Sequence, residues 1–324
     1  MEINRHLIRT YSLLGSHRTY GQVALEFPKI DDKIVVLVAD QCLPAGLNRF
    51  KELYPDKFYN IGIAEQNMIG VASGLAKEGF KPFVTAQATF STTRCFDQAK
   101  INMGYMGFGI KIVGLTAGLA LGQYGATHMS VEDIALMRTI PNMVVMSPAD
   151  CVSVAKALLA MASDDRPTYI RLSGEMNNPI VYKEDFDFEI GRAITLRNGT
   201  DIAVIATGAM VYNSLKAAEK LEESGLSVKV VDMHTIKPLD EEAVKSACSA
   251  KLIVTVEEHS IYGGLGGAVA EALALEQNKP PHLIIGVSGD YPHAASYPYL
   301  LEQTGLTPDK IALKIQNTYQ EITK

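Results

Sequence analysis

No run of apolar residues in this sequence is long enough to cross a lipid bilayer, and no cluster of basic residues is present. The 30 Lys and Arg residues are outnumbered by 36 Asp and Glu residues, which gives a net charge of −6. These absences argue against a membrane-spanning protein and against binding to nucleic acid or anionic lipid. The stretch from Met1 to Leu14 has no signal-peptide core, so we expect a cytoplasmic location.

Cysteine is scarce as well. The 324 residues include four cysteines, none of them in a CxxC pair: Cys42, Cys95, Cys151 and Cys248. Scattered cysteines without metal-ligand or disulfide spacing indicate buried or free thiols in a reducing compartment.

What the sequence does contain is a regular alternation of strand-like and helix-like segments. Lys33 to Ala39 is a continuous aliphatic run, typical of a strand buried on both faces. Similar strands are expected at residues 81–85, 109–115, 143–146, 168–172, 202–206, 227–231, 252–256 and 283–287, with helices between them. This alternation predicts an α/β protein with parallel sheets and right-handed crossovers.

The length and composition fit two such domains. Of all residues, 47% are hydrophobic and 20% are charged, which is ordinary for a protein that buries a sizeable core. We expect two doubly wound, three-layer α/β/α domains: a first domain over residues 1–175, a linker rich in Gly, Pro and acidic residues over 176–199, and a second domain over 200–324.

Glu65 is the first candidate for chemistry. A short strand-like run ends at Gly62, where glycine permits a sharp turn, and a helix of small residues begins with Glu65 in its first turn. Apolar and small neighbours indicate a poorly solvated carboxyl group, whose charged form burial disfavours. Such a group suits proton exchange with a weakly basic partner. The alternative is a plain helix N-terminal charge, which the macrodipole favours.

Two further candidates follow strands. His128 ends a glycine-rich loop over residues 118–128, the kind of position where catalytic residues concentrate; a solvent-exposed histidine is the alternative. Phe90 lies in a turn between a strand and a helix, where an aromatic ring either fills the core or stacks on a ligand. Asp40 directly follows the first buried strand, at the edge where open α/β sheets bind ligands.

Other patterns carry less chemistry. The glycines of residues 263–267 do not meet the GxGxxG spacing, so we interpret them as close helix–sheet packing. Glu257, Glu258 and His259 alternate in direction along a strand end, which favours a structural or interface role over a metal cluster. Ser130 and Asp133 have the spacing of an approximate capping box at the start of a helix.

With Glu65, Phe90 and His128 set in two α/β units, the chain resembles the C-terminal half of a transketolase, as the separate small subunit of a split enzyme. That half comprises the pyrimidine-binding domain and the C-terminal domain. The resemblance spans nearly the whole chain, and its family also holds deoxyxylulose-phosphate synthases and the β subunits of 2-oxo acid dehydrogenases. The motifs that carry it are residues 62–68, Phe90 with Arg94 and Asp97-Gln98, and residues 125–128, 138–143 and 237–240.

The resemblance implies thiamine diphosphate chemistry. Glu65 would hydrogen-bond N1′ of the aminopyrimidine and favour its imino tautomer, Phe90 would stack on that ring, and Gln87 would line its pocket. Asp40 matches an acidic residue that transketolases place near the thiazolium and that deoxyxylulose-phosphate synthases lack. His128 matches a histidine that contacts the donor sugar and assists proton transfer.

The resemblance also implies a partner. The motif that binds the diphosphate and Mg²⁺ is absent, because Gly289-Asp290 is followed by Tyr291 where a glycine is required. No metal ligand is therefore expected on this chain, and a diphosphate-binding subunit would hold the Mg²⁺. Two pairs of subunits would form an α2β2 heterotetramer acting on sugars or sugar phosphates.

Departures from the family bear on the substrate. Gln87 and Thr93 stand where transketolases have aromatic residues, and Thr116 and Tyr124 replace a histidine and an aspartate that contact sugar hydroxyls. Ser173 is followed by Gly174 instead of a phosphate-binding arginine, and Arg171 is expected to face away. Tyr124 and Ser173 thus become candidates for substrate binding. The reaction implied is the transfer of a two-carbon ketol unit with an unusual substrate, one with a different terminal anion or none.

Two other functions stay open on the sequence. A decarboxylating relative, similar to a deoxyxylulose-phosphate synthase or a dehydrogenase β subunit, would release CO₂ from pyruvate, although Asp40 favours the transketolase reading. A partner or scaffold subunit without cofactor is disfavoured, since Glu65, Phe90 and His128 occur together.

Overall fold

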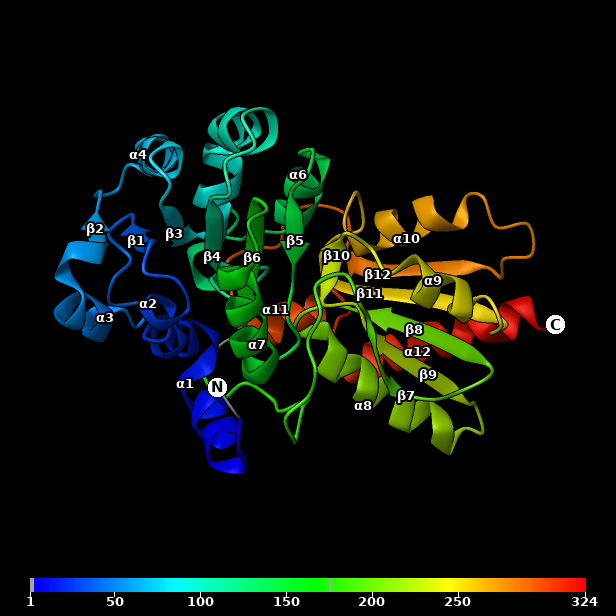
Figure 1. Cartoon of the computed structure of the whole chain (residues 1–324). Helices are drawn as coiled ribbons and strands as arrows, with labels where there is room; N and C mark the ends of the chain where they lie inside the picture. Colours follow the sequence, from blue (N-terminus) through cyan, green and yellow to red (C-terminus); the bar gives the residue numbers. More distant parts are fainter. Residues whose placement is uncertain (1–2, 175) are drawn as a thin grey trace.

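A computed structural model describes residues 3–174 and 176–324 of the protein; Glu175, the expected end of the first domain, lies outside the described residues. The chain forms two β-sheets with helices on both sides of each (Figure 1). The α/β fold class predicted from the sequence is confirmed.

The first sheet has seven strands in the order β10-β5-β6-β4-β3-β1-β2. Its members are β1 (Ile34–Val38), β2 (Phe58–Asn60), β3 (Lys81–Gln87), β4 (Lys111–Ala117), β5 (Val144–Met146), β6 (Thr168–Ser173) and β10 (Thr235–Lys237). Every residue of β1 and β5 is buried, which explains why these segments are purely aliphatic or Met. The strands from β5 to β2 run parallel, so their carboxyl ends form one edge.

Seven α-helices accompany this sheet in the described part of the chain: α1 (Arg5–Ala24), α2 (Phe27–Ile30), α3 (Asn48–Leu53), α4 (Glu65–Lys77), α5 (Phe96–Ala99), α6 (Asp133–Thr139) and α7 (Cys151–Ser163). α1 is kinked at Gly15, whose φ of 78° and ψ of 171° are not helical. Between β3 and β4, α5 is flanked by two π-helical turns, Phe90–Arg94 and Lys100–Tyr105.

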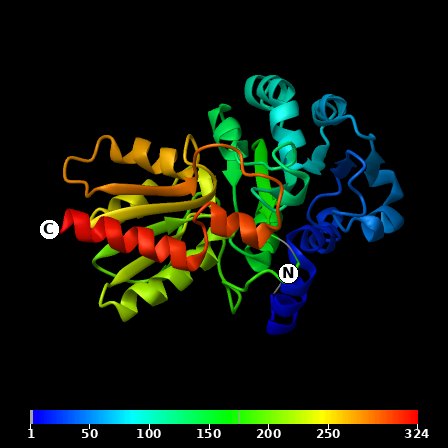
Figure 2. The same cartoon turned by 180° about the vertical axis from the view of Figure 1, so that it is seen from behind.

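The second sheet has five strands in the order β12-β11-β8-β9-β7. They are β7 (Ile194–Arg197), β8 (Ile202–Ala206), β9 (Val228–Asp232), β11 (Leu252–Ser260) and β12 (His282–Val287). Helices α8 (Met210–Glu223) and α12 (Pro308–Ile322) pack together, and α12 lies along this half in Figure 2. The remaining helices are α9 (Glu241–Ala247), α10 (Leu265–Leu273) and α11 (Tyr297–Gln303).

Two strands run against the expected parallel pattern. β7 lies inside the expected linker over 176–199 and pairs antiparallel with β9. β10, from the second half of the sequence, pairs antiparallel with β5 of the first sheet. The two halves are therefore joined by backbone hydrogen bonds as well as by side-chain packing.

Candidate functional site

Glu65 is the first residue of α4, directly after the turn at Gly62, which has a φ of 78°. The residue is 3% exposed, as its small and apolar neighbours predict. Oε2 of the carboxylate accepts a hydrogen bond from Nη1 of Arg94 at 2.7 Å. A buried carboxylate thus sits at a helix N-terminus with one exposed arginine as its ion-pair partner.

Phe90 and His128 lie on the other side of this arginine. The Arg94 guanidinium carbon is 4.2 Å from the centroid of the Phe90 ring, a cation–π contact. The Phe90 ring meets the His128 ring edge-on, with centroids 5.4 Å apart. Glu65, Arg94, Phe90 and His128 therefore contact one another in this order. On the sequence, Arg94 stood out only as part of the motif around Phe90.

Asp40 follows β1 and is exposed, with a φ of 56°. The Asn60 amide donates to Oδ1 of Asp40 at 3.1 Å, and the Asn60 oxygen accepts from the backbone N–H of Asp40 at 3.1 Å and of Gly62 at 3.0 Å. Asn60 therefore fixes Asp40 relative to the turn that presents Glu65. Sequence reasoning missed Asn60, whose only visible sign was a polar residue at the end of a strand.

A cavity of about 390 Å³ opens at the carboxyl ends of β3 and β4. Its polar lining comes from His17, Gln41, Gln87, Thr116, Tyr124 and His128. Oε1 of Gln87 is buried without a hydrogen-bond partner among the described residues. Nδ1 of His128 lies 2.9 Å from Oγ1 of Thr127, which leaves Nε2 for a ligand.

His17 and Arg18 were missed on the sequence. They follow the kink in α1, and Nε2 of His17 accepts the backbone N–H of Thr116 at 2.9 Å. Burial lowers the pKa of His17 to about 4, so this ring is neutral at physiological pH. A second hollow of about 290 Å³ shares His17 and Thr116 with the first, and exposed Arg18 lines it.

Ser173 lies apart from His128 and Tyr124. It lines a third, smaller cavity of about 110 Å³, and its carbonyl accepts from the Ser16 hydroxyl at 3.1 Å. Ser16 and Gly174 line both this cavity and the second hollow. The third cavity therefore adjoins the second hollow, which in turn adjoins the first. The Arg171 side chain faces away, as predicted, into a buried ion pair with Asp133.

The site has an apolar rim on the surface. Large hydrophobic side chains are exposed on and beside α4 and the π-helical turn that packs on it: Ile63 (77% exposed), Val71, Ile101, Tyr105 (83% exposed) and Met106. Gathered apolar surface of this kind is typical of a protein interface.

Two expectations outside the site have clear outcomes. The helix after the glycine-rich loop begins at Asp133 with Glu132 at its N-cap, so the predicted capping box of Ser130 and Asp133 is wrong. Asp133 is instead drawn into the core by Arg171. Glu257 is structural, as expected, because its carboxylate accepts the backbone N–H groups of Leu265 and Gly266 at the start of α10.

Fold and site together define a class: α/β proteins with two sheets that gather polar side chains at the carboxyl edge of a parallel sheet. Residues 18–178 match the model of the transketolase pyrimidine-binding domain, and residues 191–311 match that of the transketolase C-terminal domain. The chain belongs to the transketolase family and corresponds to the C-terminal subunit of its split members.

Individual relatives support this assignment to the transketolase family. The chain is 40% identical to a 6-deoxy-6-sulfo-D-fructose transketolase subunit of Clostridium sp. (strain MSTE9), covering 90% of this chain and 91% of the relative. It is 38% identical to one subunit of the apulose-4-phosphate transketolase of Phocaeicola vulgatus, covering 85% of this chain and 88% of the relative. A solved split-gene transketolase, an inactive β4 tetramer, superposes with a TM-score of 0.85 at 37% identity over 94% of this chain and 98% of that one.

Among the described residues, no group of three or more His, Cys, Asp or Glu side chains is placed to hold a metal ion. No described helix is both long and apolar enough to cross a membrane.

Proposed function

We propose that this chain is the smaller, C-terminal subunit of a thiamine-diphosphate-dependent split transketolase. The assembly transfers a two-carbon ketol unit from a ketose donor to an aldose acceptor. Residues 1–175 form the pyrimidine-binding domain, 176–199 the linker and 200–324 the C-terminal domain. We assign the assembly to the cytoplasm, where its four unpaired cysteines stay reduced.

One observation carries the proposal: a buried carboxylate, Glu65, begins α4, and the apolar rim is exposed on this helix and on the π-helical turn packed against it. A buried acid at an exposed apolar face is the expected form of half an active centre that a second subunit completes. No group of three or more His, Cys, Asp or Glu among the described residues is placed to hold a metal ion. The proposal assigns the diphosphate and the Mg²⁺ to the partner subunit. The assembly is an α2β2 heterotetramer.

The side chains present fit an aminopyrimidine. Gln87 offers a buried oxygen without a partner, Phe90 offers an aromatic face, and Glu65 offers a carboxylate that can share a proton with the ring nitrogen N1′. Asp40, which Asn60 holds in place, would contact the thiazolium end. When bound, thiamine diphosphate supplies the nucleophilic carbon that the reaction needs.

His128 and Tyr124 handle the donor sugar. Because Nδ1 of His128 is occupied by Thr127, Nε2 is the atom that exchanges a proton with a substrate hydroxyl or carbonyl oxygen. Tyr124 packs against the His128 ring, with centroids 5.1 Å apart, and lines the same cavity. Ser173 lies at the far end of the series of hollows and contacts the distal part of a long substrate.

Arg18 supports a substrate that carries a terminal anion. No arginine follows Ser173, yet the exposed Arg18 lines the second hollow, one step from the catalytic cavity. A guanidinium can bind phosphate or sulfonate oxygens in a bidentate manner. The relatives act on ketoses with a sulfo group or a phosphate, as their names state.

The test is reconstitution. The chain is purified alone and together with a diphosphate-domain transketolase subunit, and both samples receive thiamine diphosphate, Mg²⁺ and a panel of ketose donors and aldose acceptors. We expect ketol transfer only from the assembled pair. Full turnover by the chain alone contradicts the proposal, and CO₂ release from pyruvate by the pair assigns the decarboxylating alternative instead.

A further inference from the structure

The glycine-rich loop that carries Tyr124 and His128 is closed at its base by backbone pairing. Gly118 and Ser130 exchange two hydrogen bonds, with N to O distances of 2.8 and 2.9 Å. Between these residues the loop has one short helical turn, Gly122–Tyr124. Local backbone hydrogen bonds also join its residues, among them the N–H of His128 to the carbonyl of Gly125 at 3.0 Å. Contacts from outside the loop then decide where this locally bonded segment, and His128 with it, lies.

Glu258, on β11 of the second sheet, makes the contact at the first loop residue. Its Oε1 accepts the backbone N–H of Leu119 at 2.6 Å, and its Oε2 accepts the Tyr297 hydroxyl at 2.8 Å. A Cβ atom at Gly118, which has a φ of 75°, would stand 2.4 Å from Oε1, so glycine is required for this approach. Glu258 is 1% exposed, and both carboxylate oxygens are engaged.

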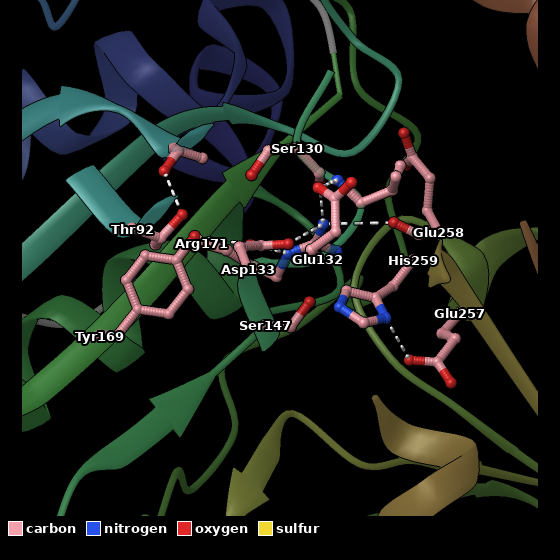
Figure 3. Close-up of polar contacts among 12 residues, drawn as sticks. Thr92, Ser130, Glu132, Asp133, Ser147, Tyr169, Arg171, Glu257, Glu258 and His259 are labelled. Atoms are coloured by element: carbon pink, nitrogen blue, oxygen red, sulfur yellow. Dashed lines mark hydrogen bonds and ion pairs between the residues drawn. The ribbon is translucent and has the colours of Figure 1, made fainter. Parts of the chain in front are cut away.

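The other end of the loop is tied to the same residue through Arg171. Nη2 of Arg171 donates to the carbonyl of Ser130 at 3.3 Å and to the carbonyl of Glu258 at 3.2 Å. The buried ion pair with Asp133 fixes the guanidinium, and Figure 3 shows it between Asp133 and Glu258. One end of the loop is thus held directly by Glu258 of β11, and the other end by Arg171 of β6, which contacts Glu258 in turn.

A segment of the C-terminal half also lies along the loop. The backbone N–H of Ala295 donates to the carbonyl of Gly122 at 3.2 Å, and the Tyr291 hydroxyl donates to Glu132 just beyond the loop. Leu300 packs so closely on Gly122 that an added Cβ would lie 1.9 Å from its Cδ1. The base and the middle of the loop are therefore both braced from the C-terminal domain.

We propose that Glu258 is a positioning residue, through which the C-terminal domain holds the glycine-rich loop so that His128 and Tyr124 face the substrate. The effect on catalysis rests on the proposed function, whereas the effect on the loop does not. Glu65 lies on another element, and Phe90 meets the loop only through its edge-on contact with the His128 ring. Glu258 therefore acts mainly on substrate handling.

A three-variant comparison tests this. Glu258→Leu removes both side-chain contacts. Glu258→Gln keeps an acceptor for the Leu119 N–H and a polar contact to Tyr297; burial raises the pKa of Glu258 to about 7, so a neutral side chain suits the site. Thr255→Val is the matched control, because Thr255 is buried in the same strand and its hydroxyl contacts His282, away from the loop.

The first readout is hydrogen–deuterium exchange of the full chain. We expect Glu258→Leu to speed exchange in residues 118–130 by at least about fivefold, with wild-type rates in the Gln and Thr255→Val variants. If Glu258→Leu does not fold, Tyr297→Phe, which removes one of the two partners, is expected to speed loop exchange by about twofold. Unchanged loop exchange, or an equal rise throughout the chain, overturns the proposal.

The second readout is the steady-state kinetics and cofactor affinity of the assembled enzyme. Glu258→Leu should lower kcat/KM for the donor by about tenfold or more, leave the Kd of thiamine diphosphate unchanged, and be rescued by Gln. A loss of cofactor affinity, or no change in kcat/KM, contradicts the assignment. If the wild-type pair shows no ketol transfer, the proposed function has failed, and the exchange measurement alone decides the role of Glu258 in the loop.

Discussion

At the scale of single residues, the site depends on a carboxylate with little access to water. Changing Glu65 to Gln keeps the shape and burial of the side chain but removes its capacity to accept a proton. We expect the assembled enzyme to lose about 10²- to 10⁴-fold in kcat, the usual size of a general acid–base contribution. The measurement is steady-state turnover of the reconstituted pair, with size-exclusion chromatography to show that assembly is intact. Turnover equal to that of the wild type would remove Glu65 from the chemistry.

Arg18 is a second residue whose role can be isolated. Changing it to Gln should raise KM at least about tenfold for donors with a terminal phosphate or sulfonate, since a charge-assisted contact is lost. KM for uncharged ketoses should stay the same. Arg49→Gln is a matched control, because Arg49 is an exposed arginine on α3 that lines none of the three hollows. An equal rise in KM for charged and uncharged donors would argue against an anion contact.

At the scale of elements, Asp232 at the end of β9 joins the second sheet to the segment between the halves. The Tyr182 hydroxyl donates to its Oδ2 at 2.6 Å, while Oδ1 is buried without a partner among the described residues. Burial, with Asp150 acting in the same direction, raises the pKa of Asp232 to about 7. The folded chain therefore holds this proton more tightly than the unfolded chain, and its stabilising effect is complete below about pH 4 and is lost as the pH rises through about 7.

Asp232→Asn should remove this part of the pH dependence. Thermal unfolding followed by circular dichroism at several pH values between about 5 and 8 is expected to show a smaller fall in Tm for the variant than for the wild type. The upper limit is about 4 kcal/mol, the equivalent of a three-unit shift in pKa. Asp309→Asn, at an exposed position on α12, is the control. Parallel Tm curves for Asp232→Asn and wild type would show that Asp232 does not titrate in this range.

The same scale shows what the sequence could predict. β1 and β8 were predictable because a run of buried aliphatic residues has few alternatives to a central parallel strand. β10 was not, because three residues form a strand there only after β5 is in place beside them. Asp133 was misjudged for a similar reason: its spacing from Ser130 suggests a cap, but the stronger partner is Arg171, 38 residues away.

The residues of the candidate site likewise fall into those that local sequence patterns indicate and those that only distant contacts bring to the site. Glu65, Phe90 and His128 stand next to glycines, turns and strand ends, so local patterns point to them. His17 and Arg18 enter the site only because the kinked α1 reaches the end of β4, where His17 bonds to a residue 99 positions away. Arg94 joins Glu65 to Phe90 through a π-helical turn whose position no local pattern indicates. Contacts made between distant segments were therefore the part that the sequence could not give.

At the scale of the whole molecule, the exposed apolar rim around Glu65 predicts the surface that contacts the partner. Tyr105, 83% exposed on the helical segment beside α4, is a large aromatic of the kind that dominates interface energetics. Tyr105→Glu should weaken association with the diphosphate-domain subunit at least about tenfold, since it places a charge in a desolvated contact. The fold should be unaffected, because the side chain is in solvent in the isolated chain.

The control for this experiment lies at the other end of the molecule. Leu275, just after α10, is 92% exposed and far in sequence from the rim, so Leu275→Glu makes the same kind of change outside the expected interface. Titration calorimetry of each variant with the partner subunit should give a wild-type Kd for Leu275→Glu and a raised Kd for Tyr105→Glu. At low protein concentration, Tyr105→Glu should also lose turnover, whereas Leu275→Glu should not. Equal affinities for the two variants would place the partner elsewhere. The buried carboxylate would then open onto a surface that no second subunit covers, and the split active centre would have to be abandoned.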